Sequence, residues 1–236
     1  MFAGFSFVAS KLSNPYLMHR WLIPLFLLAG ITSCSQHITP QADRGTLEHI
    51  PEFESKYLDG RQVDVWLPEG YSKEKQYPVF YMHDGQNLFD TTTAFMGSEW
   101  GVDETLSRLQ DTAGIRPPIV VGIWNSGRTR PFDYMPEAPA QSLSKEEIKK
   151  AKEDLGWLKS FLYNFYDFKA DEYLQFLTQE LKPYIDSHYS TLPGREHTFI
   201  GGSSMGGLIS WYALSEYPGI YGGAACLSTH WPGTYT

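Results

Sequence analysis

The sequence is short of positive charge. Its 236 residues contain 19 lysines and arginines against 27 aspartates and glutamates, which gives a formal charge of −8. Binding to nucleic acid needs a basic face that neutralises phosphates, so this balance argues against a nucleic-acid partner. The charged fraction of 19% and the hydrophobic fraction of 42% describe a globular protein, long enough for one large α/β domain or two small ones.

The sequence also lacks an apolar run long enough to span a bilayer. The run at residues 21–30 is about half as long as the roughly 20 residues of a spanning helix. It has the length of a signal-peptide core, and Arg20 supplies the positive end. Because Met18 stands just before this charge, we interpret Met18 as the natural start and residues 1–17 as an upstream extension that is not normally translated.

There are only two cysteines, and their positions differ in meaning. Cys34 ends the tetrapeptide Ile31-Thr32-Ser33-Cys34, which resembles a bacterial lipobox. The resemblance implies cleavage before Cys34 and acylation of its sulfur and amine, which would hold the protein stably on a membrane. A plain secretory signal cut nearby is the alternative, and the domain is exported under both interpretations. Cys226 lies in an apolar run and is expected to be a small buried strand residue.

After the predicted signal peptide (residues 1–34), residues 35–49 have the composition of a tether, and residues 50–236 form the domain. Phe53–Leu58 and Gln62–Leu67 are strand-like segments. The dipeptide Asp59-Gly60 between them favours a tight hairpin turn, since both residues accept positive φ. The sheet is therefore predicted to begin antiparallel.

The rest of the domain alternates between strands and helices. Residues 77–82 and 118–123 are continuous apolar runs, typical of strands covered on both faces. Residues 100–109 and 171–188 carry apolar side chains at helical spacing. This order predicts a doubly wound α/β fold, in which ligands gather at the carboxyl ends of the strands. Residues 142–166 interrupt it as an aromatic-rich insertion, either a lid over the site or a helix that braces the core.

Ser204 is the strongest candidate for a catalytic residue. It is the centre of Gly202-Ser203-Ser204-Met205-Gly206, between the strand-like run 197–200 and the helix-like run 208–214. Such a serine sits in a strained strand-to-helix turn, and the glycines allow strand and helix to approach closely. The alternative is a glycine-rich loop whose serine only caps the helix.

Several spaced blocks together resemble one family. The sequence is similar to the Putative esterase family of α/β-hydrolases, which includes feruloyl and acetylxylan esterases, enterobactin esterase, esterase D-type enzymes and mycolyltransferases. The similarity covers about residues 50–232. The blocks that carry it are His83-Asp84-Gly85-Gln86-Asn87-Leu88-Phe89-Asp90, Trp100-Gly101-Val102-Asp103, Gly122-Ile123 and Gly202-Ser203-Ser204-Met205-Gly206-Gly207.

The resemblance implies roles for individual residues. Ser204 is the nucleophile, and the N–H groups of Met205 and Gln86 form the oxyanion hole. Asp84 is expected to stabilise the loop as a hydrogen-bond acceptor, and His83 to be a hydrogen-bonded scaffold group. No cofactor and no metal are expected.

Five further residues are candidates for substrate binding. Arg128, Arg130 and Tyr134 lie in a segment that resembles one beside the family's cleft, although a solvated loop is an equal alternative. His230 and Trp231 follow the last predicted strand and are expected to line the acyl or alcohol pocket. A role for His230 as the general base is the less favoured alternative.

The triad is incomplete in this sequence. In this fold the acid and the histidine follow the serine, yet the residues after Ser204 include no aspartate, one glutamate (Glu216) and one histidine (His230). The sequence therefore predicts an α/β-hydrolase domain that is truncated at its C-terminus, with its last strands missing, and that is nearly inactive. Its open edge and apolar surface would favour aggregation.

The predicted function is that of an exported, membrane-anchored serine ester hydrolase, periplasmic or at the cell surface. Its expected substrates are acetyl or feruloyl esters of carbohydrates, with a siderophore ester as the second choice. A non-catalytic surface lipoprotein that binds glycan or siderophore is the alternative from another class. Hydrolysis and acyl transfer to another alcohol are both open.

Overall fold

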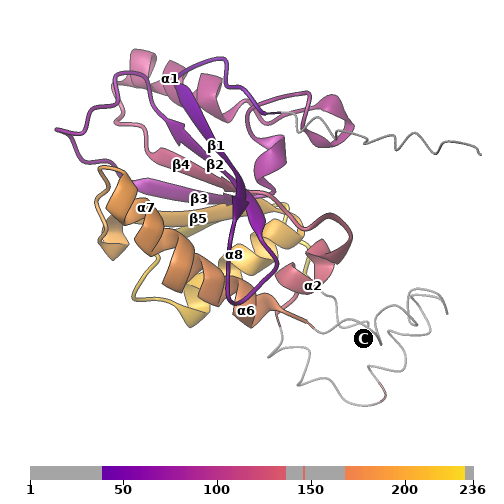
Figure 1. Ribbon diagram of the computed structural model, residues 1–236. Helices are drawn as coiled ribbons and strands as arrows, with labels where there is room; N and C mark the ends of the chain where they lie inside the picture. The colour runs from indigo at the N-terminus through magenta and orange to yellow at the C-terminus, as the bar shows by residue number, and fades with distance from the viewer. Residues whose placement is uncertain (1–38, 137–145, 147–167, 232–236) are drawn as a thin grey trace, which may run out of the picture. The chain divides into compact units, whose positions relative to one another are not determined.

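The computed structural model describes residues 39–136, 146 and 168–231 (Figure 1). They form a six-stranded sheet in the order β1-β2-β4-β3-β5-β6. Strand β2 is antiparallel to β1 and to β4, and the other neighbouring strands are parallel. The prediction of a mostly parallel sheet with an antiparallel N-terminal hairpin is confirmed. The strands are Thr46–Phe53 (β1), Arg61–Leu67 (β2), Val79–His83 (β3), Ile119–Ile123 (β4), Thr198–Ser203 (β5) and Gly223–Leu227 (β6).

The helices follow the predicted order. They are Val102–Ala113 (α1), Arg130–Tyr134 (α2), Ala170–Gln175 (α6), Lys182–His188 (α7) and Met205–Glu216 (α8). A π-helical turn, Phe176–Leu181, joins α6 to α7 in one long helix (Figure 1). Pro183 has no N–H to donate to Gln179, and the widened turn before it accommodates its ring. Short 3₁₀ turns lie at Gly85–Asn87, Phe95–Gly97, Gly127–Thr129 and Arg195–His197.

Side-chain alternation along the strands gives the sheet two apolar faces. Val63 and Val65 belong to a large core that also contains residues of α6, α7, the π-helical turn and α8. Trp66 and Met82 point the other way into a smaller core, against which Val102 and Leu106 of α1 pack. Helices therefore cover both faces, which is the doubly wound arrangement.

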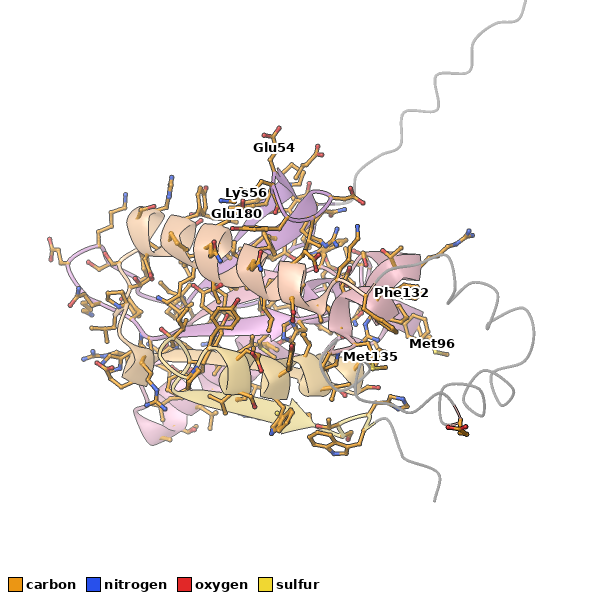
Figure 2. The ribbon with its side chains drawn as sticks, turned by 90° about the horizontal axis from the view of Figure 1, so that it is seen from below. Glu54, Lys56, Met96, Phe132, Met135 and Glu180 are labelled. Carbon is orange, nitrogen blue, oxygen red and sulfur yellow. The ribbon has the colours of Figure 1, made fainter. Side chains whose placement is uncertain are left out.

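The N-terminal hairpin differs in detail from the prediction. Strand β1 already begins at Thr46, inside the expected tether, and it ends at Phe53, so residues 54–60 form a loop instead of a two-residue turn. The Ser55 hydroxyl turns the chain there by accepting the N–H groups of Tyr57 and Leu58 and donating to Glu180. The Lys56 N–H also donates to Glu180 at 3.2 Å, and Figure 2 shows Lys56 beside Glu180 of the π-helical turn.

Strands β5 and β6 are partly open to solvent. A groove of about 480 Å³ lies over this part of the sheet, and Phe199 in it is 37% exposed. Cys226 of β6 is half-buried, less than expected for a core residue, because β6 is the last strand of the described sheet. Among the helices described here, none is long and apolar enough to cross a membrane.

Candidate active site

Ser204 lies at the turn between β5 and α8. Its backbone has φ 57° and ψ −120°, a conformation that costs a residue other than glycine about 1–3 kcal/mol. The turn is held from both sides: Ser204 N–H donates to Leu227 O at 3.0 Å, and Ser204 O accepts from Gly207 N–H at 3.1 Å and His230 N–H at 3.1 Å. The side chain is exposed and makes no capping hydrogen bond to α8. The strained turn is therefore present, and the helix-cap alternative is not supported.

The glycines of the motif are required by close backbone contacts. A Cβ atom on Gly202 would lie 2.9 Å from the carbonyl carbon of Gly206. One on Gly207 would lie 2.7 Å from Thr229 Oγ1. A side chain at Gly202 would push α8 away from β5, as the motif predicts, and one at Gly207 would collide with the Thr229 side chain after β6.

The loop after β3 adjoins this turn. Strands β3 and β5 are parallel neighbours, with Met82 opposite Gly201. A Cβ atom on Gly206 would lie 3.3 Å from His83 Cβ and 3.4 Å from Asp84 Oδ2. The two segments predicted to form the oxyanion hole therefore lie side by side.

Met205 and Gln86 each have a backbone N–H without an acceptor among the described residues. Met205 is the first residue of α8, where N–H groups have no partner inside the helix. Gln86 lies in the 3₁₀ turn, and its side-chain Oε1 accepts Asn125 N–H at 3.2 Å. Their use as oxyanion donors remains a prediction.

Asp84 anchors this loop. It has a positive φ of 59°, in the left-handed region where aspartate is among the few non-glycine residues commonly found. Arg130 makes a bidentate ion pair with it (2.6 and 2.7 Å), and Asn125 Nδ2 donates to it at 2.8 Å. Asp84 is thus an acceptor that stabilises the loop, as expected.

His83 lies behind the loop, fully buried. Its Nδ1 is 2.8 Å from the hydroxyl of Tyr173, and the rings of Tyr134 and Tyr173 pack around it. Burial lowers the pKa of His83 to about 4. It is therefore a neutral scaffold group at pH 7, as expected.

This pKa predicts a loss of stability in acid. Between pH 6.5 and 4 the unfolded chain protonates His83 and the folded chain does not, so the free energy of unfolding falls by about 3 kcal/mol as pH decreases. Below pH 4 this residue contributes no further loss. We expect urea denaturation at several pH values to show a smaller decrease for His83→Gln than for the wild type. Other titrating groups, such as Glu99, are common to both proteins, so the difference isolates His83. If the free energy of unfolding falls by the same amount with decreasing pH in both proteins, the prediction is contradicted.

The structure corrects the expectation for Tyr134. Its side chain is 1% exposed, and its ring lies under the Arg130 guanidinium at 4.9 Å. Its hydroxyl accepts Asp84 N–H at 3.4 Å. Because it is buried behind the loop, Tyr134 supports the site and does not present a surface to substrate. Arg128 is exposed on the 3₁₀ turn before α2, and its contact with substrate remains a prediction.

His230 and Trp231 lie next to the turn. The backbone N–H of His230 bonds to Ser204 O, while its side chain is exposed. Within the described residues no hydrogen bond joins the imidazole to the Ser204 hydroxyl. Trp231 packs edge-on against Trp211 of α8 at 5.7 Å. Glu216 is exposed at the end of α8, as expected. Neither His230 nor Glu216 is arranged here as the base or acid of a triad.

Sequence reasoning missed the role of Asn125, which binds both Asp84 and Gln86. The sequence signal that could have identified it is its position: Asn125 is a polar residue just after the carboxyl end of strand β4. Ligands bind at the carboxyl ends of the strands in such sheets. The predicted insertion at residues 142–166 and the predicted lipidation site Cys34 fall outside the part of the chain that the structure describes.

The fold and the strained serine turn define the class as α/β-hydrolase. A model of the "Putative esterase" family matches residues 55–233, and the chain belongs to this family.

Three solved structures are similar to it. The CE1 ferulic acid esterase from Anaeromyces mucronatus is 22% identical, with a TM-score of 0.53, over 81% of this chain and 62% of that one. An IroE-like serine hydrolase from Shewanella oneidensis is 26% identical, with a TM-score of 0.53, over 78% of this chain and 50% of that one. The enterobactin esterase from Shigella flexneri is 19% identical, with a TM-score of 0.57, over 84% and 41%. The chain thus spans between 41% and 62% of the length of these proteins.

Proposed function

We propose that this chain carries the nucleophile of a serine ester hydrolase. The observation that supports this most is the conformation of Ser204: its hydroxyl is exposed on a backbone with φ 57° and ψ −120°. Such strain persists only where the surroundings enforce it, and it is common at functional sites. A protein that only bound glycan or siderophore would have no need of it, which disfavours a non-catalytic lipoprotein.

In the proposed mechanism the Ser204 hydroxyl attacks the ester carbonyl and loses its proton to a base. The N–H groups of Met205 and Gln86 donate to the oxygen that becomes negative. The alcohol leaves with a proton, and water then releases the acyl group from Ser204. We propose that the base and its acid partner are residues other than those described here, because no hydrogen bond among the described residues joins the His230 imidazole to the Ser204 hydroxyl, and this chain spans only part of its relatives.

For the substrate we propose acetyl or feruloyl esters of carbohydrates. The similarity to a ferulic acid esterase supports this choice. The similarity to enterobactin esterase supports a siderophore ester as the second candidate.

The test is hydrolysis of a panel of esters by the chain extended with the C-terminal portion of a relative. We expect feruloyl and acetyl esters of sugars to be hydrolysed at least tenfold faster than a siderophore ester. The reverse order would favour the second candidate. A folded extended protein with no activity on any ester would contradict the proposed function.

We further propose that the protein is exported and anchored through Cys34. The apolar run before a lipobox-like tetrapeptide supports this. On expression in bacteria, the wild type is expected in the membrane fraction with an acylated Cys34 as its first residue. Cys34→Ala is expected to stay unprocessed or to become soluble, with Cys226→Ala as the matched control. A mature terminus beyond Cys34, found by mass spectrometry, would rule out the anchor.

A further inference from the structure

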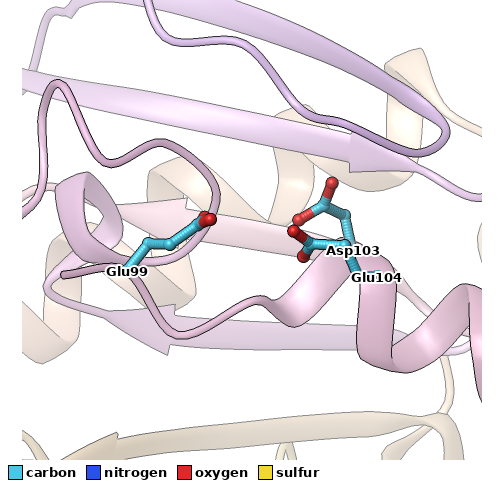
Figure 3. Close-up of side chains that lie close together, drawn as sticks. All are labelled: Glu99, Asp103 and Glu104. Carbon is cyan, nitrogen blue, oxygen red and sulfur yellow. The ribbon is translucent and has the colours of Figure 1, made fainter.

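Three acidic side chains converge where the chain enters α1. One carboxylate oxygen from each of Glu99, Asp103 and Glu104 lies within 4.8 Å of the other two. Figure 3 shows Asp103 and Glu104 on the first turn of the helix, with Glu99 pointing toward them from the preceding loop. The cluster combines residues of two different local structures.

Each member has a buried oxygen with no partner. Asp103 is fully buried; its Oδ2 accepts Arg44 N–H at 2.9 Å, but its Oδ1 has no hydrogen-bond partner among the described residues. The same holds for Oε2 of Glu99 and Oε2 of Glu104. Buried polar atoms are almost always paired.

The described protein supplies no positive charge to these oxygens. Arg44 donates its backbone N–H to Asp103, but its guanidinium pairs with Glu69 and Asp111 and not with the cluster. No ion pair to any member of the cluster is recorded in the described residues. Three carboxyl groups, each with a buried oxygen, thus meet without a positive partner among the described residues.

We propose that Glu99, Asp103 and Glu104 bind a divalent cation of the calcium class. Hard cations prefer carboxylate oxygens, and Ca²⁺ binds them at about 2.3–2.6 Å. Two oxygens on opposite sides of such an ion are then about 4.6–5.2 Å apart, and oxygens at an angle are closer. The observed spacing fits this range. Backbone carbonyls or water would complete the coordination.

The site would be structural. Trp100 N–H donates to Asn87 O at 2.9 Å, and Val102 N–H donates to Leu88 O at 3.2 Å. The segment that carries the cluster is therefore bonded to the chain that directly follows Gln86. A bound cation would fix this segment to α1 and to the backbone of Arg44. This inference does not depend on esterase activity.

The test uses the full chain, stripped with EDTA and titrated with CaCl₂. We expect saturable binding by calorimetry, with a dissociation constant on the order of 10⁻⁵ to 10⁻³ M. At a hundredfold excess over this constant, the melting temperature should rise by about 5–10 °C. Tb³⁺ should give a luminescence signal through Trp100, the residue next to Glu99, that excess Ca²⁺ removes.

Two variants and a control decide the outcome. Glu99→Gln, on the loop, and Asp103→Asn, in the helix, should each weaken binding at least tenfold, while the exposed Glu216→Gln should bind as the wild type does. If Asp103→Asn fails to fold, Glu99→Gln alone carries the comparison. The proposal is overturned if the wild type binds no Ca²⁺ up to about 10 mM, or if Glu99→Gln binds as tightly as the wild type.

Discussion

Replacing Ser204 with alanine is expected to lower kcat/KM for an aryl ester by at least a thousandfold in the chain extended with a relative's C-terminal portion. The covalent intermediate cannot form without the hydroxyl, so only the oxyanion donors and substrate binding remain. Ser203→Ala, one residue earlier at the end of β5, is the matched control and should keep most of the activity. A fluorophosphonate should label the extended protein on Ser204, as mass spectrometry of its peptides would show.

The same assay distinguishes the possible bases. The 236-residue chain alone is expected to show at most trace activity, because Ser204 has no hydrogen-bonded base among the described residues. His230→Ala should change mainly substrate binding in the extended protein. Ordinary enzymatic rates in the chain alone, lost on His230→Ala, would contradict this and identify His230 as the base. Retained activity in Ser204→Ala would instead refute the assignment of the nucleophile.

Replacing Gly85 with alanine is expected to destabilise the fold by about 3 kcal/mol or more. The new Cβ atom would lie 2.5 Å from the carbonyl carbon of Gly122 and 2.8 Å from Ile123 N, both backbone atoms of β4. Backbone in a central strand cannot move aside as a flexible side chain can. The loop that carries Gln86 would have to shift, so we expect esterase activity to fall together with stability.

The measurement is urea denaturation followed by tryptophan fluorescence, together with the melting temperature, which should fall by about 6–12 °C for a loss of this size. Gly219→Ala is the matched control, since nothing lies within 4 Å of a Cβ atom at that position. We expect it to change the free energy of unfolding by no more than about 0.5 kcal/mol. Equal midpoints for the two variants would show that the contact between the loop and β4 is looser than the structure indicates.

The local features of this protein were determined by its sequence. Apolar runs predicted β3 and β4, helical spacing predicted α1 and the long helix of α6 and α7, and the glycines around Ser204 predicted the strained turn. Each of these signals lies within a few residues, because periodicity and turn conformation are properties of the local backbone. The family resemblance added the loop after β3, which the structure places beside the turn.

Other features were decided only by the tertiary structure. The partners of buried polar groups come from distant parts of the chain: Arg130 and Asn125 reach Asp84 across more than 40 residues, and Arg44 reaches Asp103 across 59. No local pattern encodes such a pairing, since it follows from which strand ends and loops the packed sheet brings together. The burial of Tyr134 and the acidic cluster at α1 were missed for the same reason. The early start of β1 likewise depends on pairing with β2, in which Thr46 lies opposite Leu67.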